Sequence, residues 1–371
     1  MLSLPPSSSA SSDVHIALPK NAQYLSAVRD SCSQLSALST PDVQIDQEAI
    51  NTFVEAIDPQ TWTAAKTASP VRMPLKFDTL EQELNLMALI AFLSFGSGYR
   101  EELRTELDRD HADTVRFGIM SMHISSVEIN ATFLSALTLA EVSAFFDIPI
   151  TKEVAHATLP MTMTEPHPLR QLVQMLTDVL NEIGKALKVK GFRNLGHFLL
   201  DATNSGPTTG PTVERLLDAV LNTFPSARDM DRWGGIDTYI FRRAQMMVAS
   251  LHQQFRDADP QRFNFVDVDG LTAFSDEVLI VVLLHLNILK VSPTVDRWLS
   301  AGKDLTKVAG KWDLRLRAAA LEAVENIVAS GRRVGSFSDM TPVEVDTYLR
   351  SLSLPDQSPL TSLRSRSSSF Y

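Results

Sequence analysis

Apolar side chains recur at spacings of three and four residues along most of this chain, which is the pattern of amphipathic helices. In residues 169–187, for example, Leu172, Leu176, Leu180 and Ile183 fall on one helical face. The predicted helices cover residues 21–35, 46–57, 79–95, 113–124, 135–146, 169–187, 213–222, 239–255, 278–289, 312–329 and 342–352.

The segments between these helices complete the predicted fold. Short strands are expected near residues 236–239 and 263–266, whereas the Pro-rich residues 160–168 and the Gly/Pro/Thr-rich residues 204–211 are expected to be loops. No internal repeat or domain-separating linker is visible. The chain is therefore predicted to be mainly α, with one helical domain over residues 21–355 and at most a few short strands.

Both ends of the chain depart from the helical pattern. Residues 1–20 are rich in Ser and Pro and are expected to be disordered. Residues 356–371 form a Ser-rich tail that ends in Phe370-Tyr371. Inside the chain, the prolines of residues 70–74 are expected to keep that connector from being helical.

Several helix starts are marked by polar residues that can accept hydrogen bonds from free backbone N–H groups. Asp46 is the expected N-cap of its helix, and Thr138 with Glu141 fits a capping box. Ser275 is expected to cap the very apolar helix that follows, which would place Asp276 in the first helical turn.

Composition narrows the class of protein. With 44% hydrophobic and 21% charged residues, the chain can bury a large core, and its net charge of -10 offers no basic surface for polymeric nucleic acid. Cys32 is the only cysteine, which excludes an intrachain disulfide and a multi-Cys zinc site and suits a reducing compartment. The start lacks the features of a signal peptide and no apolar run is long enough for a membrane span, so we expect a cytoplasmic or nuclear protein.

The common cofactor and metal motifs are missing from the sequence. The eight histidines form no H-E-x-x-H pattern, and neither a phosphate-binding P-loop nor a G-x-S-x-G elbow occurs. Asp267, Asp269 and Gly270 resemble the start of a calcium loop, but the remaining ligands are absent. We therefore expect neither a metal nor a cofactor.

Four groups of residues are candidates for a site, and each also has a purely structural interpretation. Phe95 and Tyr99 flank two glycines, which either cap a helix or belong to an aromatic loop that faces a substrate. Arg242 and Arg243 are either solvated or paired with acids, or one of them grips a phosphate. Asp346 and Tyr348 are either a capping acid and a packed ring, or contacts to a substrate. Phe274 and Asp276 form the fourth group.

Asp276 is the candidate with the clearest chemistry. With Glu277 it can serve simply as a negative charge at a helix N-terminus. Alternatively, it is a carboxylate held ionised against Phe274, where it would face developing positive charge. Cleavage of an N-glycosidic bond needs such a group, because its transition state resembles an oxocarbenium ion.

Several ordered blocks resemble the queuosine-salvage family, the queuosine 5'-phosphate N-glycosylase/hydrolases. They occur in the family's order over roughly residues 80–371. The blocks are Val179-Leu180-Asn181-Glu182-Ile183-Gly184-Lys185, Phe224-Pro225-Ser226-Ala227-Arg228-Asp229, Phe241-Arg242-Arg243-Ala244-Gln245, Phe274-Ser275-Asp276, Leu283-Leu284-His285-Leu286, Asp346-Thr347-Tyr348-Leu349 and Phe370-Tyr371.

The resemblance implies a fold akin to helix-hairpin-helix DNA glycosylases and release of the base queuine from queuosine 5'-phosphate. It places the catalytic acid at Asp276, the base-contacting ring at Phe274 and an acid that holds the base at Asp346. The family's aromatic segment corresponds to residues 95–99. The implied partner is a small nucleotide, and the protein is expected to be a monomer.

The chain departs from the family's pattern in places. Arg242 stands where Lys is common, Ile280 where Pro is usual, and Thr347 and Arg350 where the family has Tyr and Trp; Ser351 replaces an acid. These changes affect base recognition more than bond cleavage. Two alternatives therefore stay open: a non-catalytic relative that binds a nucleoside or a protein partner, and a helical scaffold without a small-molecule site.

Overall fold

The computed structural model describes residues 16–38, 41–66, 75–156, 158–204, 210–305, 311–335 and 337–352. These residues are mainly helical, as the apolar spacing predicts. The α-helices are α1 (Tyr24–Ala37), α2 (Gln47–Glu55), α3 (Pro59–Lys66), α4 (Leu80–Phe92), α5 (Arg100–Leu107), α6 (His111–Ile124), α7 (Ala131–Ala136), α8 (Leu139–Phe146), α9 (Arg170–Lys190), α10 (Leu195–Ala202), α11 (Val213–Thr223), α12 (Arg242–Phe255), α13 (Pro260–Phe263), α14 (Glu277–His285), α15 (Pro293–Ser300), α16 (Trp312–Val334) and α17 (Pro342–Ser351).

The strands of the described residues form three separate antiparallel pairs: β1 with β6, β2 with β3, and β4 with β5. Short 3-10 turns lie between the larger elements. The bounds are β1 (Val43–Ile45), β2 (Thr151–Ala155), β3 (Thr162–Pro166), β4 (Met230–Trp233), β5 (Ile236–Tyr239), β6 (Leu289–Val291), η1 (Lys20–Ala22), η2 (Ser97–Tyr99), η3 (Pro225–Ala227) and η4 (Val268–Gly270).

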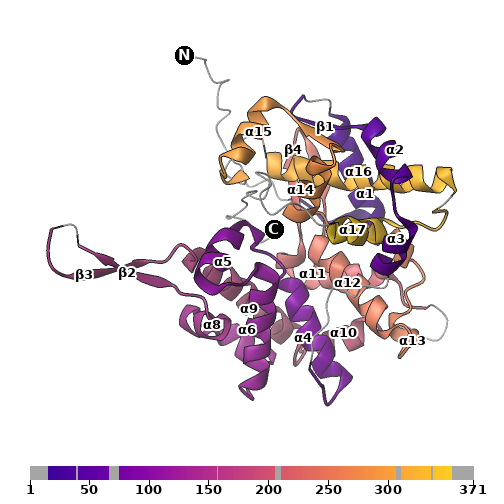
Figure 1. Ribbon diagram of the computed structural model, residues 1–371. Coiled ribbons are helices and arrows are strands. Elements are labelled where there is room, and N and C mark those ends of the chain that lie inside the picture. Colours follow the sequence, from indigo (N-terminus) through magenta and orange to yellow (C-terminus); the bar gives the residue numbers. More distant parts are fainter. Residues whose placement is uncertain are drawn as a thin grey trace.

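The helices gather into two groups that meet near the middle of the molecule (Figure 1). In the upper group α16 packs against α1, α2, α14 and α17, and α17 also packs against α3. In the lower group α4 packs against α6, α10 and α12, while α7 and α8 pack against α9. The N-terminal ends of α12 and α14 lie close together, because Arg242 at the start of α12 bonds to Asp276 at the start of α14.

Two of the three predicted capping sites are confirmed, and the third is corrected. Asp46 accepts hydrogen bonds from the backbone N–H groups of residues 48 and 49, and Thr138 with Glu141 forms the capping box. Ser275, however, is not the cap of α14. Asp276 itself is the N-cap, because its side chain accepts a hydrogen bond from the Leu279 N–H.

Other element boundaries differ from the sequence predictions for local reasons. The predicted helix 79–95 ends at Phe92, and Gly96 follows with a left-handed φ of 100°. The predicted helix 135–146 is split between α7 and α8, and α12 starts at Arg242 because Phe241 has a φ of 48°.

The strand predictions are partly right. The expected strand at residues 236–239 is β5, whereas residues 263–266 contain no strand. The predicted loop 160–168 contains β3, so a hairpin was missed. The connector 70–74, residues 1–15 and the C-terminal tail lie outside the described residues, whereas residues 16–20 of the expected disordered start are described and Lys20 begins η1. The single-domain organisation and the likeness to DNA glycosylases stay predictions. Within the described ranges, no helix combines the length and apolar character needed to cross a membrane.

Candidate active site

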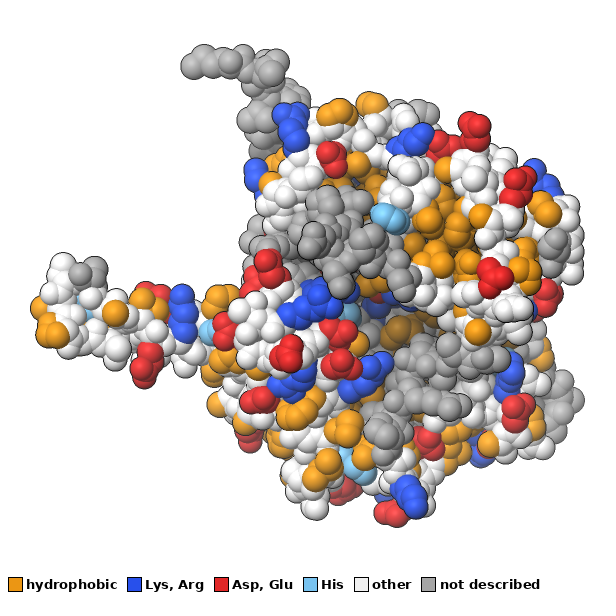
Figure 2. Space-filling view, in the orientation of Figure 1, with side chains coloured by type: hydrophobic (Ala, Val, Ile, Leu, Met, Phe, Trp, Pro, Cys, Tyr) orange, Lys and Arg blue, Asp and Glu red, His pale blue; other side chains and the backbone are white. Residues whose placement is uncertain are grey.

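A cavity of about 910 Å³ opens between the two groups of helices. Its walls come from α4 and α6, from one side of α12, from η4, from the start of α14 and from α17. Figure 2 shows this face hollowed near its middle, with both basic and apolar side chains around the hollow. The volume is ample for a nucleotide-sized ligand.

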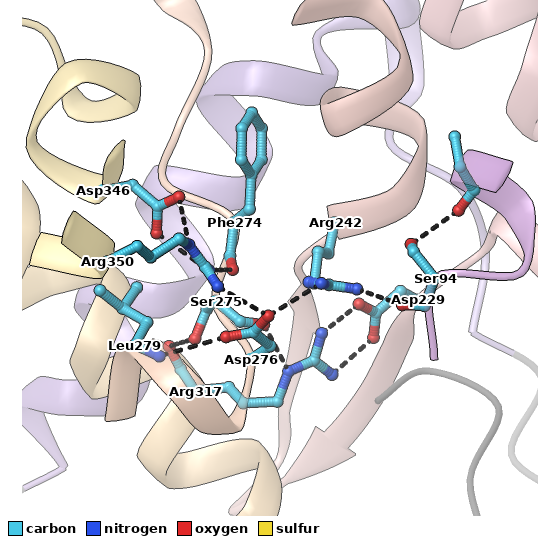
Figure 3. Close-up of polar contacts among 11 residues, drawn as sticks. Ser94, Asp229, Arg242, Phe274, Ser275, Asp276, Leu279, Arg317, Asp346 and Arg350 are labelled. Carbon is cyan, nitrogen blue, oxygen red and sulfur yellow. Dashed lines mark hydrogen bonds and ion pairs between the residues drawn. The ribbon is translucent and has the colours of Figure 1, made fainter. Parts of the chain in front are cut away.

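Asp276 lies in the wall of this cavity and is only 4% exposed. One carboxylate oxygen, Oδ1, accepts a hydrogen bond from the Leu279 N–H at 3.1 Å. The other oxygen, Oδ2, accepts from Arg242 Nη2 at 2.8 Å and from Arg350 Nη1 at 3.0 Å. Figure 3 shows the carboxylate between these two guanidinium groups. Asp276 is therefore held from three directions.

The charge state of Asp276 follows from this surrounding. Burial by itself would raise the pKa of the carboxyl group, but the charges of Arg350 and Arg242 and the hydrogen bonds to the carboxylate outweigh burial. The pKa of Asp276 therefore lies well below its usual range. The site holds an ionised carboxylate in a largely dry environment at neutral pH.

Arg350 joins Asp276 to the second buried acid. Its Nε donates to Asp346 Oδ2 at 2.8 Å and its Nη2 to Asp346 Oδ1 at 3.1 Å. Nη2 also donates to the Phe274 carbonyl at 2.7 Å. Burial would lower the pKa of Arg350, but Asp276 and Asp346 raise it above its usual value. Burial raises the pKa of Asp346, and Arg350 opposes that rise.

Arg242 approaches Asp276 from α12 and is 5% exposed. Its Nη1 donates to the Ser94 carbonyl at 2.7 Å. Its Nε is buried and has no hydrogen-bond partner among the described residues. Burial lowers the pKa of Arg242, although Asp276 opposes this. Because Arg242 lines the cavity, its guanidinium charge can attract a bound anion.

A second buried ion pair supports the segment that carries Asp276. Arg317 of α16 pairs with Asp229, and each of the two side chains is 3% exposed. Arg317 Nε donates to the Ser275 carbonyl at 3.2 Å, and Ser275 Oγ donates to the Arg317 carbonyl at 3.0 Å. The Asp229 carbonyl accepts from the N–H groups of residues 240 and 241, directly before Arg242. The Asp229–Arg317 ion pair therefore holds in place the two segments that carry Arg242 and Asp276 (Figure 3).

His111 lies at the start of α6 and also lines the cavity. Its Nδ1 is buried without a hydrogen-bond partner in the described part of the chain. Burial lowers the pKa of His111 to about 4, and the nearby charges of Asp110 and Asp276 oppose this shift. The imidazole is therefore neutral at physiological pH and able to accept a proton.

The profile of the queuosine salvage protein family matches residues 127–367, more than half of the chain. The chain belongs to this family. The matched range includes Asp276, Asp346 and Arg350 but begins after His111.

Curated relatives of this family member carry the name queuosine 5'-phosphate N-glycosylase/hydrolase. The protein from Sphaerobacter thermophilus is 29% identical over 149 residues, which are 40% of this chain and 45% of the relative. The Mus musculus protein is 27% identical over 211 residues, 54% of this chain and 59% of the relative. The Bos taurus protein is 29% identical over 187 residues, which are 48% of this chain and 52% of the relative. The chain thus spans about half the length of the curated relatives it matches.

Four of the eight residues that the sequence singles out line the cavity of this queuosine-salvage family member: Phe274, Asp276, Asp346 and Arg242. The other four do not line it. Phe95 and Tyr99 are each 1% exposed. Tyr348 packs against Trp62, with ring centroids 5.5 Å apart.

Arg243 points away from the cavity. Its Nη1 donates to the Phe92 carbonyl at 2.6 Å, Nη2 donates to the Ser226 carbonyl, and the guanidinium lies 5.4 Å from the centroid of the Phe95 ring. Burial lowers the pKa of Arg243 to about 10. Its contacts support an internal packing role.

Two cavity residues were missed from the sequence, Arg350 and His111. Arg350 stands four residues after Asp346 in α17, a spacing typical of helical ion pairs, so the pairing itself was predictable. Its contact with Asp276, 74 residues away, was not. Nothing in the sequence around His111 indicates that it faces the same cavity.

Proposed function

We propose that this protein hydrolyses the N-glycosidic bond of queuosine 5'-phosphate and releases queuine, leaving ribose 5-phosphate. The observation that carries this proposal is Asp276, a buried carboxylate kept ionised in the wall of a nucleotide-sized cavity. Membership of the queuosine salvage protein family and the names of its relatives support the choice of substrate.

The chemistry of the leaving group explains why an ionised acid matters. A 7-deazaguanine has carbon at position 7, so protonation of N7 cannot help the base to leave. The transition state must then be stabilised mainly at the sugar, where positive charge develops as the bond breaks. A fixed negative charge next to the sugar lowers that barrier without any reorganisation of solvent. Asp276 fills this role, either as an electrostatic partner or as the nucleophile.

The other cavity residues fit the remaining parts of the substrate. Phe274 lies directly before the Ser275-Asp276 pair and would pack on the base, and Asp346 would accept hydrogen bonds from N–H groups of the base. Arg242 would bind the 5'-phosphate because it lines the cavity, a role that the contacts of Arg243 do not favour. His111 would take the proton from the attacking water.

The test is release of queuine from queuosine 5'-monophosphate by the purified protein, followed by mass spectrometry. Asp276→Asn removes the charge but keeps the shape, and we expect it to lower the rate by about 100-fold or more. Asp296→Asn is the matched control, because Asp296 is an exposed acid in the first turn of α15. A folded Asp276→Asn protein with full activity would refute the assignment.

A second candidate function has one observation in its favour. Two arginines pair with Asp276 and offset the negative charge that would face the sugar, so the resting site is suited to binding a nucleotide without cleaving it. In that case queuosine 5'-monophosphate would raise the melting temperature of the protein while no queuine appears. Release of queuine by the wild type but not by Asp276→Asn would exclude this alternative.

A further inference from the structure

Arg350 is the most heavily bonded side chain of the cavity wall. It donates to Asp346 twice, to Asp276 once and to the Phe274 carbonyl once. Each of its three nitrogens is engaged in these contacts. Its side chain nevertheless keeps 28% of its surface exposed and lines the cavity. A guanidinium committed in this way acts through its neighbours more than as a direct ligand for the substrate.

The effect on Asp346 is chemical as well as geometric. Asp346 is 2% exposed, and burial favours the protonated form of such an acid. The bidentate contact with Arg350 favours the carboxylate instead, in which both oxygens only accept hydrogen bonds. Each oxygen then keeps a further lone pair for a ligand in the cavity.

We propose that Arg350 is a specificity-determining positioning residue, which holds Asp346 as an acceptor for a base with two adjacent N–H donors and fixes it relative to Asp276. Guanine-type bases, including 7-deazaguanines, present a ring N–H beside an amino group on one edge. Adenine-type bases have an unprotonated ring nitrogen there, which would meet a carboxylate oxygen without a proton between them. The inference rests on the proposed function for the orientation of the base.

The charged groups around Asp346 make this role testable by pH. Arg350 and Glu344 lie on the same helix, Asp276 and Arg242 face it from α14 and α12, and Lys66 and His111 line the cavity from α3 and α6. Arg350 is the only one of these cations bonded directly to Asp346 among the described residues. Without it, Asp346 is expected to take up a proton nearer to neutral pH and to become a donor on one oxygen.

The experiment measures binding of two free bases, 7-deazaguanine and 7-deazaadenine, by calorimetry between pH 5 and pH 8. We expect the wild type to prefer 7-deazaguanine by roughly tenfold or more. In Arg350→Gln this preference should shrink, most strongly at the acidic end. Arg350→Lys should restore part of it, because the cation returns without the bidentate geometry.

Two further variants separate this role from a loss of folding. Asp346→Asn mimics the protonated acid and should show a weak preference that no longer depends on pH. Arg297→Gln is the matched control, since Arg297 is an exposed helical arginine that donates to the carbonyl of Pro293, four residues earlier. All variants are compared at equal folded fraction, judged by circular dichroism. If Arg350→Gln does not fold, Arg350→Lys and Asp346→Asn still carry the comparison.

The outcomes distinguish this inference from the proposed function. An unchanged preference in Arg350→Gln at every pH, or no preference or no binding in the wild type, would overturn the role of Arg350. Failure of the wild type to release queuine, with the base preference present and sensitive to Arg350, would overturn only the hydrolase proposal.

Discussion

A single residue, Asp276, shows how two opposing effects decide a charge state. Burial to 4% exposure penalises its ionised form, yet Arg242 and Arg350 bond to one of its oxygens and the Leu279 N–H bonds to the other. The attraction of the two arginines outweighs the effect of burial, so the pKa of Asp276 falls below its usual value. A simple helix-capping acid would not require two arginines.

Removal of Arg242 should raise the pKa of Asp276, because one of the two opposite charges is lost. In Arg242→Gln, Asp276 keeps only Arg350 as a cationic partner, so its pKa should rise. The acidic limb of the pH profile of kcat/KM should then move to higher pH, because more of Asp276 is protonated at a given pH. Queuine release between pH 4 and pH 8 checks this, with Arg297→Gln as the control. An acidic limb that stays in place would show that Arg242 does not set the charge of Asp276.

His111 makes a prediction about stability that needs no substrate. Burial lowers its pKa to about 4 in the folded protein, whereas an unfolded histidine titrates near 6.5. The unfolded state therefore takes up a proton first as the pH falls. Stability should drop between about pH 6.5 and pH 4 and change little from this group above that window.

Urea unfolding at pH 7 and pH 5 measures this drop. His111→Gln should reduce the loss of stability between the two pH values. His252→Gln removes the other histidine whose pKa is lowered, and it should leave the contribution of His111 in place. An identical pH dependence in the wild type and His111→Gln would mean that His111 titrates normally.

At the scale of elements, the pair formed by Asp229 and Arg317 ties α16 to the segments that precede α12 and α14. Removal of one partner leaves a buried charge without compensation. We expect Asp229→Asn to lower the free energy of unfolding by about 3 kcal/mol. The double variant Asp229→Leu/Arg317→Met should lose less than Asp229→Asn alone.

Urea denaturation of the wild type, Asp229→Leu, Arg317→Met and the double variant gives the coupling between the two residues. Asp113→Asn, which breaks an exposed pair with Arg116 on α6, should cost less than about 0.5 kcal/mol and serves as the control. A double variant that loses as much as the sum of the single variants would show that the pair does not act as a unit.

The sequence predicted most helices but not how they meet. Local signals were sufficient where the cause is local, as at the capping residues Asp46 and Thr138. The start of α12 was misplaced because the left-handed Phe241 is held by hydrogen bonds to distant Asp229, which no local pattern reveals. For the same reason Asp276 was recognisable as a candidate, whereas its bond to Arg350 became visible only when α14 and α17 were packed together.

At the scale of the whole molecule, the β2–β3 hairpin projects from the body of the protein beside α5 and α8 (Figure 1). Its strands pair with each other from Thr151 and Pro166 outward, and most of their side chains are exposed. Near its tip Leu159 and Met161 are each 53% exposed. A two-stranded ribbon of this kind is marginally stable alone, so it adds little to the stability of the domain.

Replacement of residues 152–165 by an Asn-Gly turn tests whether the hairpin is separable from the fold. Because Thr151 and Pro166 are directly paired, a two-residue turn can close the chain between them. The melting temperature should change by less than about 2 °C, and queuine release should be unchanged, since none of the described hairpin residues lines the cavity. A lower melting temperature that also depends on protein concentration would instead mean that the exposed apolar tip is buried between copies of the chain, which contradicts the expected monomer.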